Sequence, residues 1–310
     1  MITALAGGVG AAKLLRGLVG GPDAGAVTAI VNTGDDTIMH GLHISPDLDT
    51  VSYTLSGRSD DDRGWGLSDE TWVVMETLEK LGGDTWMRLG DHDLATHLYR
   101  TNRLSEGATL SEVTHELCSA LGVPARLLPM SDDPVRTRIQ LADGPEIAFQ
   151  DYFVRLRHAV AVSGVRFDSA GAARPAPGVI EAIGGAEALI ICPSNPILSI
   201  GPLLSVPGIA DAVRSRREST VAISPIVAGA ALKGPADRLM QELGHEPSVV
   251  GVARIYRDLA STLVVDEADA SLAADVEKEG LRCVVTPTVM SDRARTVALA
   301  NTAVREALRK

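Results

Sequence analysis

Short apolar runs and longer amphipathic stretches alternate along most of the chain. The apolar runs that predict buried strands, each bounded by turn residues, are residues 2–6, 26–31, 188–192, 220–226 and 281–285. The stretches with apolar residues at helical spacing, which predict helices, are residues 11–18, 68–81, 92–103, 111–121, 235–243 and 293–308. This alternation predicts an α/β fold with a Rossmann-like, mainly parallel sheet and helices on both faces.

The middle of the chain has a different pattern. It is more helical from about residue 47 to residue 121, and short antiparallel strands are expected at 126–128, 136–141 and 146–149. We therefore predict a nucleotide- and phosphate-binding core formed by residues 1–46 and 181–310. Residues 47–180 are predicted to form an inserted, mostly helical subdomain that covers the carboxyl ends of the strands, where α/β sheets bind ligands.

Composition and charge narrow the class of partner. The formal net charge is −11 at pH 7, which disfavours a nucleic-acid-coating role because such binding depends on basic surfaces. The three cysteines are far apart and show no metal-binding spacing. No apolar run reaches the ~20 residues of a membrane span, and no signal peptide is evident. We expect a cytoplasmic protein whose partners are small molecules, without a nucleic-acid or membrane partner.

A glycine-rich turn follows the first predicted strand. Gly7, Gly8 and Gly10 let the backbone approach a phosphate closely, and the helix that follows offers unpaired N–H groups and the positive end of its dipole. Lys13 adds a positive charge one turn into that helix. The turn matches neither a P-loop nor a complete GxGxxG pattern, so a tight strand-to-helix turn without a ligand is the alternative.

Two acidic segments follow in the sequence. Asn32-Thr33-Gly34-Asp35-Asp36 ends the second strand and offers groups for Mg²⁺ or a ribose hydroxyl, or else only caps a polar turn. In Ser45-Pro46-Asp47-Leu48-Asp49, carboxylates at alternate positions can hold one hard cation, and the alternative is a helix N-cap.

Two further loops are predicted to meet the ligand. Ser194 and Asn195 lie between two prolines at the end of a buried strand, so a rigid loop presents them at the ligand-binding edge of the sheet. Lys233 and Gly234 belong to a second glycine-rich turn, in which the lysine is available for an anionic group.

Taken together, the ordered segments resemble the 2-phospho-L-lactate transferases of coenzyme F-420 biosynthesis, and in particular their actinobacterial, phosphoenolpyruvate-linked members. The resemblance covers nearly the whole chain. The segments that carry it are AGGVGAAKLLRGL, VNTGDD, SPDLDTVSYTLSG, RGWGLSDETW, WMRLGDHDLATHLYRT, FQDYFV, IICPSNPILSIGPLL and SPIVAGAALKGPADRLM.

The resemblance implies a transfer reaction. A phospho-three-carbon-acid group, phosphoenolpyruvyl or 2-phospholactyl, passes from its guanosine diphosphate conjugate to the ribityl hydroxyl of the deazaflavin Fo. GMP leaves, and coenzyme F-420-0 or its dehydro form results. Mg²⁺ is the implied cofactor, and family members suggest a homodimer.

The implied site residues fall into three groups. The catalytic and metal-binding candidates are Asp47 and Asp49, with Asp36 as a further possible base and Asp61 and Asp62 as further metal ligands. The nucleotide and phosphate candidates are Gly7, Gly8, Gly10, Lys13, Asn32, Ser194, Asn195, Lys233 and Gly234. The candidates for the Fo site, on the inserted subdomain, are Trp86, Leu89, Gly90, Asp91 and Phe149.

Two other functions fit parts of the sequence. An NAD-type Rossmann enzyme would use the opening glycine-rich turn and place Asp35 on a ribose, but leaves the SPDLD and PSNP segments unexplained. A non-catalytic nucleotide-binding regulator with the same fold would bind a nucleotide tightly and would not turn over Fo.

Overall fold

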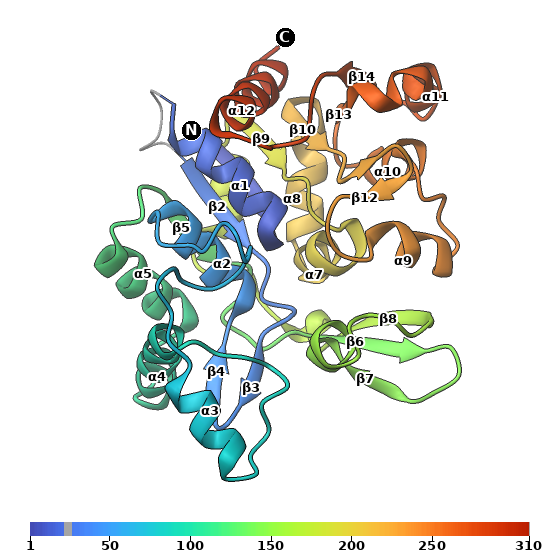
Figure 1. Ribbon diagram of the computed structural model, residues 1–310. Helices are drawn as coiled ribbons and strands as arrows, with labels where there is room; N and C mark the ends of the chain where they lie inside the picture. Colours follow the sequence, from blue (N-terminus) through green and yellow to red (C-terminus); the bar gives the residue numbers. More distant parts are fainter. Residues whose placement is uncertain (22–26, 310) are drawn as a thin grey trace.

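The central feature of the computed structural model, which describes residues 1–21 and 27–309, is a seven-stranded sheet. All of its neighbouring strands pair in parallel, in the order β14-β13-β10-β9-β1-β2-β5 (Figure 1). The strands are β1 (Ile2–Ala6), β2 (Val27–Val31), β5 (Arg126–Pro129), β9 (Ala188–Ile191), β10 (Thr220–Ile223), β13 (Thr262–Val265) and β14 (Arg282–Val285). The chain order reverses between β1 and β9, so the carboxyl ends of these two strands frame the crevice where such sheets bind ligands.

Helices cover both faces of the sheet, because alternate strand residues enter two separate cores. In β1, Ala4 packs on one face and Leu5 on the other, and both are fully buried. The first core contains residues of α1 (Gly8–Val19), α2 (Pro46–Leu55) and α12 (Arg293–Ala307). The second contains residues of α6 (Val179–Gly184), α7 (Gly201–Ser205), α8 (Ile209–Ser215), α10 (Val249–Tyr256) and α11 (Ala273–Lys278). The predicted α/β class is confirmed.

The predicted strands of the core appear with small shifts of boundary. The strand expected at residues 26–31 is observed from Val27, and Ala26 lies outside the described residues. The strand expected at 220–226 stops at Ile223, and the next two-residue strand, β11 (Ile226–Val227), pairs with β12 (Ala230–Ala231) instead. The sequence analysis missed β13, a fully buried four-residue strand.

The middle of the chain does not form one continuous insertion as predicted. Strand β5 was expected to be antiparallel and part of the inserted subdomain, but it pairs in parallel with β2 at the edge of the main sheet. Helix α2 packs on α1, and α5 (Leu110–Leu121) packs on β5. The core therefore includes parts of residues 47–180, because β5 completes the sheet beside β2.

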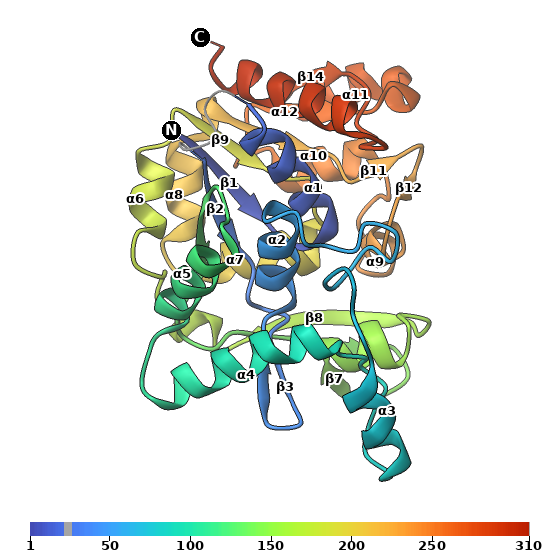
Figure 2. The same cartoon turned by 60° about the vertical axis from the view of Figure 1, so that its left-hand side comes forward.

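The remaining elements of this region extend below the sheet (Figures 1 and 2). They are the hairpin of β3 (Thr37–Met39) and β4 (Leu42–Ile44), helices α3 (Val73–Lys80) and α4 (Asp91–Ser105), and an antiparallel sheet of β6 (Arg136–Leu141), β7 (Glu146–Ala148) and β8 (Val162–Asp168). Two π-helical turns, η2 (Asp151–Arg155) and η4 (Pro196–Ile200), and helix α9 (Ala236–Glu242) connect this layer to the core.

No single helix within residues 1–21 and 27–309 is long and apolar enough to cross a membrane. A pair of short helical segments, Pro196–Ser205 and Ile209–Ser215, reaches the required length and composition only together, and the pair is bent by 98°.

Two backbone segments approach each other closely at Gly10, in the first turn of α1. A Cβ atom at this position would overlap the backbone carbonyl oxygen of Pro193 in the loop after β9. We expect Gly10→Ala to lower the free energy of unfolding by about 1–3 kcal/mol, because neither backbone can move without disturbing the sheet. Gly184→Ala is the matched control, since no atom lies within 4 Å of its new Cβ. Urea unfolding of both variants checks this, and equal stabilities would contradict it.

Candidate active site

A cleft of about 960 Å³ lies at the carboxyl ends of the central strands. Loops of the main sheet line one side of it, including segments after β1, β9, β10 and β14. The other side comes from α2, the loop at residues 63–66, the segment 86–89, helix α4 and the η2 turn. Most of the predicted site residues line this cleft: Gly7, Gly8, Gly10, Lys13, Asn32, Asp47, Asp49, Trp86, Leu89, Phe149, Ser194, Asn195, Lys233 and Gly234.

The glycine-rich turn is held in place by residues of the segment that follows the neighbouring strand β9. Gly8 has φ +74°, a conformation that favours glycine, and a Cβ on Gly7 would lie 2.7 Å from Cβ of Ser199. Ser194 Oγ donates a hydrogen bond to the Gly7 carbonyl at 2.8 Å. This arrangement brings the amino end of α1 to the cleft wall, with partly buried Lys13 one turn further on.

Asn195 lines the cleft and also has a structural role. Its side-chain oxygen accepts hydrogen bonds from the backbone N–H groups of Ile197 and Leu198, at 2.9 and 3.0 Å, and so caps the η4 turn. The side-chain nitrogen remains available for a ligand.

Asp47 and Asp35 form a buried pair of carboxylates joined by one amide. The Asn32 side-chain nitrogen donates to Asp47 Oδ2 at 2.9 Å and to Asp35 Oδ1 at 3.3 Å. Burial raises the pKa of Asp47 to about 6. Burial, and then the charge of Asp47, raise the pKa of Asp35 well above its usual range. No lysine, arginine or histidine of the described residues lies within 4 Å of either carboxylate.

Asp49 does not share this environment, although it lies only two residues from Asp47. Both belong to α2, and residues two apart on a helix point about 200° apart, so the alternate spacing does not aim them at one cation. Asp49 forms a bidentate pair with the buried guanidinium of Arg100 on α4. Its negative charge is therefore already compensated within the protein.

The Asp49–Arg100 pair continues into a buried network at the cleft wall. His97 Nδ1 lies 3.3 Å from Arg100 Nη1, and His97 Nε2 lies 3.3 Å from Asp93 Oδ2. Tyr53 donates its hydroxyl proton to Asp93 Oδ1 at 2.7 Å. Burial opposes the charge of Asp93, but these partners outweigh it and lower its pKa. Asp49, Asp93 and His97 have the spacing of metal ligands, yet the adjacent guanidinium of Arg100 would repel a cation there.

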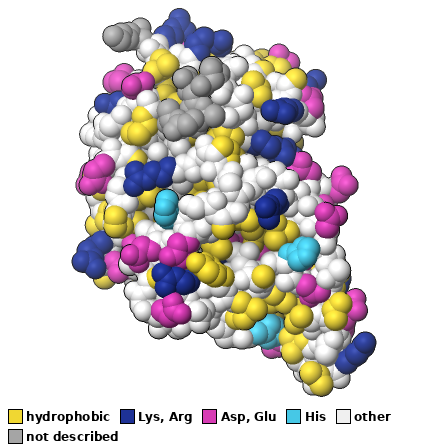
Figure 3. Space-filling view, turned by 90° about the vertical axis from the view of Figure 1, so that its left-hand side faces the viewer, with side chains coloured by type: hydrophobic (Ala, Val, Ile, Leu, Met, Phe, Trp, Pro, Cys, Tyr) yellow, Lys and Arg dark blue, Asp and Glu magenta, His cyan; other side chains and the backbone are white. Residues whose placement is uncertain are grey.

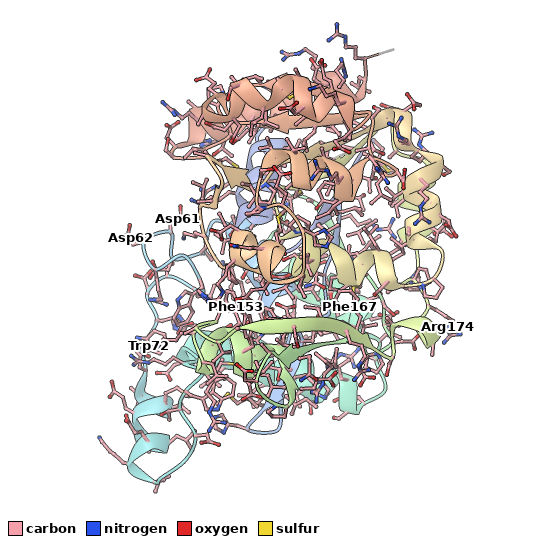
Figure 4. The ribbon with its side chains drawn as sticks, turned by 90° about the vertical axis from the view of Figure 1, so that its right-hand side faces the viewer. Asp61, Asp62, Trp72, Phe153, Phe167 and Arg174 are labelled. Atoms are coloured by element: carbon pink, nitrogen blue, oxygen red, sulfur yellow. The ribbon has the colours of Figure 1, made fainter. Side chains whose placement is uncertain are left out.

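Three of the predicted carboxylates lie outside the cleft. Asp36 accepts a hydrogen bond from Ser45 at 2.8 Å behind the cleft wall, where burial raises its pKa to about 7. Asp61 is exposed and pairs with Arg16 of α1 at 2.8 Å, which lowers its pKa. Asp62 is exposed beside it, and Figure 4 shows both at the outer edge of the molecule above Trp72.

Two of the residues predicted for the Fo site have structural roles instead of cleft positions. Asp91 accepts hydrogen bonds from the backbone N–H groups of Val73 and Val74, at 3.0 and 3.1 Å, at the start of α3. Gly90 leaves room for the Glu70 carboxylate, which caps the first turn of α4. Trp86, Leu89 and Phe149 do line the cleft.

The tip of the second glycine-rich turn reaches across the cleft to the opposite side. A Cβ on Gly64 would lie 2.6 Å from the Lys233 ammonium nitrogen, and a Cβ on Gly234 would lie 3.9 Å from the Phe153 ring. Phe153 stacks on Phe149 with ring centres 5.3 Å apart, and Figure 4 shows it inside the loop that carries Asp61. Lys233 is therefore exposed at a point where both sides of the cleft meet.

Several cleft residues were not assigned by the sequence analysis. Those on α2, α4 and the loop before α3 lie in segments that carry the family resemblance but were given no role: Tyr53, Arg63, Trp65, Asp93 and His97. Those after β14 could have been found, since they follow a predicted strand at its carboxyl end: Thr288, Val289, Met290 and Ser291. Asp266, which directly follows the missed strand β13, holds Thr288 through its N–H and hydroxyl at 2.7 and 3.0 Å.

A parallel sheet with a glycine-rich turn and buried carboxylates at its switch point is the arrangement in which many α/β proteins bind phosphate-bearing ligands. The family model described as 2-phospho-L-lactate transferase CofD matches residues 2–303. The chain belongs to this family, which confirms the resemblance and makes the protein a transferase. Neither the NAD-type enzyme nor the non-catalytic regulator gains support from this membership.

Individual relatives agree with the family. The chain is 44% identical over 310 residues to the phosphoenolpyruvate transferase of Kitasatospora aureofaciens, with 98% of this chain and 96% of the relative covered. It is 41% identical over 313 residues to the phosphoenolpyruvate transferase of Mycolicibacterium smegmatis, with 96% of each covered. A solved structure of a Bacillus halodurans protein has the same fold, with a TM-score of 0.63, 17% identity and 98% of each chain covered.

The Asp49–Arg100 pair has a measurable role in stability. We expect Arg100→Met to lower the free energy of unfolding by about 3–5 kcal/mol, because it leaves a buried carboxylate without its partner. The double variant Asp49→Asn/Arg100→Met should recover more than half of that loss, since no uncompensated charge remains. Urea unfolding measures both, and a double variant as unstable as Arg100→Met would contradict the assignment.

Proposed function

We propose that this transferase moves a phospho-three-carbon-acid group from its guanosine diphosphate conjugate to the ribityl hydroxyl of Fo, with release of GMP. The observation that carries the proposal is the meeting of two different walls in one cleft. One wall has the glycine-rich turn and Lys13, which suit a diphosphate. The other has Trp86, Met87, Leu89 and Phe149, which suit a flat aromatic ring.

The two substrates are assigned to opposite sides of the cleft. The guanosine diphosphate is proposed to lie on the main sheet, with its phosphates at Gly7–Lys13 and its nucleoside toward Ser194 and the loop after β14. The deazaflavin is proposed to lie on the side formed by the segment 86–89 and the η2 turn. The hydroxyl and the phosphorus then meet near Asp47, between these two sides.

The Asp35–Asp47 pair fits a divalent cation. Two buried carboxylates that share one amide and have no cationic partner among the described residues are costly as they stand. Their oxygen atoms are ligands that Mg²⁺ prefers, together with water and substrate phosphates. Bound Mg²⁺ would neutralise charge on the diphosphate oxygens. We therefore propose Asp47 and Asp35 as its ligands, in place of the Asp47–Asp49 set expected from sequence.

The chemical step needs little covalent help from the protein. The hydroxyl oxygen of Fo bonds to the phosphorus next to the three-carbon acid, and the bond from that phosphorus to the bridging oxygen of GMP breaks. Such transfers depend on positioning and on charge stabilisation, and the proton of the hydroxyl leaves late when the transition state is loose. Among the carboxylates predicted as base, Asp47 alone lines the cleft without a cationic partner in the described structure.

The direct test is to incubate the protein with Fo, Mg²⁺ and the guanosine diphosphate conjugates of phosphoenolpyruvate and 2-phospholactate. We expect Fo to gain the mass of one phospho-acid while GMP appears in equal amount, and chelation of Mg²⁺ should stop both. Mass spectrometry follows the reaction and identifies the preferred donor. Unchanged Fo with both donors, in the presence of folded protein that binds GDP, would refute the proposal.

Asp47→Asn separates function from stability. Folding raises the pKa of Asp47 from its ordinary value of 3.8 to about 6. Ionised Asp47 therefore lowers the free energy of unfolding as the pH rises above 3.8, and the loss is complete above about pH 6. We expect Asp47→Asn to raise the free energy of unfolding at pH 7 by about 1–3 kcal/mol without metal, and to lower transfer at least ~100-fold.

The matched control for this variant is Asp143→Asn, which removes the same charge from an exposed turn outside the cleft. Its transfer rate should stay within about threefold of the original chain. Thermal unfolding and the Fo assay measure both variants. An active Asp47→Asn enzyme would overturn the metal assignment.

A homodimer is part of the proposal. The support is apolar surface on the layer below the sheet, where Val73, Val74 and Leu81 of the α3 region and Ile38 of the β3–β4 hairpin are exposed. Figure 3 shows hydrophobic side chains gathered at the lower end of that face. Analytical ultracentrifugation tests it, and a monomer at micromolar concentration would refute it.

A further inference from the structure

Arg63 has a guanidinium nitrogen that lacks a partner in the described structure. The side chain is only 26% exposed, and its Nη1 atom is buried without a hydrogen bond to any described residue. A buried donor of this kind is costly unless a ligand or an ordered water satisfies it. Nη1 itself is covered, but Arg63 lines the cleft and its side chain is partly exposed, so the guanidinium lies at a wall that a bound substrate would contact.

The position of the Arg63 guanidinium is firmly fixed by three neighbours. Its Nη2 atom pairs with Asp60 at 2.7 Å. Its Cζ atom lies 5.1 Å from the ring centre of Trp65 and 5.0 Å from that of Trp72, and the two rings meet edge to face. Cation–π contacts of this kind hold an arginine in one orientation while leaving its edge free to donate. The loop thus holds the guanidinium in a preorganised position at the cleft wall.

Three cationic side chains gather at this place, and Arg63 is the one paired with an acid. Lys233 approaches Gly64, the residue after Arg63, and the Arg88 Cζ atom lies 4.6 Å from the centre of the Trp72 ring. All three cationic side chains line the cleft. Asp60 is the carboxylate paired with Arg63, so the remaining charges favour an anionic ligand.

The cationic side chains lie next to the proposed phosphate site. A small cavity beside the cleft is lined by Lys13 of the glycine-rich helix and by residues of the Arg63 loop, namely Asp60, Asp61, Gly64 and Trp65. The two segments are also tied together by the Arg16–Asp61 ion pair. In a 2-phospho acid, the carboxyl carbon is bonded to the carbon that bears the phosphate oxygen, so the carboxylate must lie close to the transferred phosphorus.

We propose that Arg63 binds the carboxylate of the three-carbon acid through its guanidinium and so makes the enzyme select donors that carry an acid group there. This inference rests on the proposed transfer reaction and adds the residue that recognises the acid group of the donor substrate. In this arrangement the phosphates bind to Lys13 and to the backbone of residues 7–10. The planar carboxylate binds to Arg63, in the loop that two tryptophans hold in place.

The test compares the guanosine diphosphate conjugate of 2-phospholactate with its carboxamide, which is isosteric but neutral. The original chain should prefer the acid by about 10- to 100-fold in kcat/KM, as for a hydrogen bond to a charged group. In Arg63→Gln the preference should shrink to about threefold or less, and Arg63→Lys should fall between. Arg58→Gln, which removes the same charge from an exposed position of the same loop, should keep the full preference.

A binding measurement without Fo separates this inference from the transfer itself. Trp65 and Trp72 flank Arg63, so tryptophan fluorescence should report binding of either donor, and circular dichroism checks that each variant is folded. Tighter binding of the acid that is lost in Arg63→Gln supports the carboxylate site even if no transfer to Fo occurs. An equal loss of both donors in Arg63→Gln indicates a phosphate contact and overturns it, as does a preference that survives in that variant.

Discussion

The close approach of three backbone segments around Gly7 and Gly10 is the constraint on which the cleft depends. Gly10 leaves room for the Pro193 carbonyl, and Gly7 leaves room for Ser199 and for the Asp47 carboxylate. These contacts bring the loop after β1, the loop after β9 and the first turn of α2 to one point. The amino end of α1, the Asn32 amide and the buried carboxylates meet there because no side chain separates them.

The buried acids of this site are compensated in two different ways. Asp49 has a complete ionic partner in Arg100, so it contributes to the rigidity of the wall between α2 and α4. Asp47 and Asp35 have one shared amide, so their charge is left for a ligand to balance. The helix separates the two kinds of acid, because it turns the side chains of Asp47 and Asp49 to opposite directions.

The main sheet was accessible from sequence because buried parallel strands are continuous apolar runs, and those before residue 32 and at 188–191 were placed closely. The edge position of β5 was not, since pairing with β2 depends on packing and leaves no local pattern. Asn32 and Ser194 could be placed at the cleft from sequence because each follows a predicted strand at its carboxyl end, where parallel sheets bind ligands. Arg100 was missed because its partner Asp49 lies 51 residues away in sequence.

The overall charge of the chain says little about this cleft. A protein of net charge −11 would repel a diphosphate conjugate at long range, yet solvent and salt screen that repulsion within about 10 Å. Inside the cleft, local groups decide: Lys13, Arg63 and Lys233 lie on its walls together with the N–H groups of the glycine-rich turn. The acids of the same cleft do not cancel this attraction, because Asp49 is already paired and Asp93 is held by Tyr53 and His97. The pair of Asp47 and Asp35, which has no cationic partner within 4 Å in the described structure, is the place where the proposed divalent cation would lie between protein and phosphate.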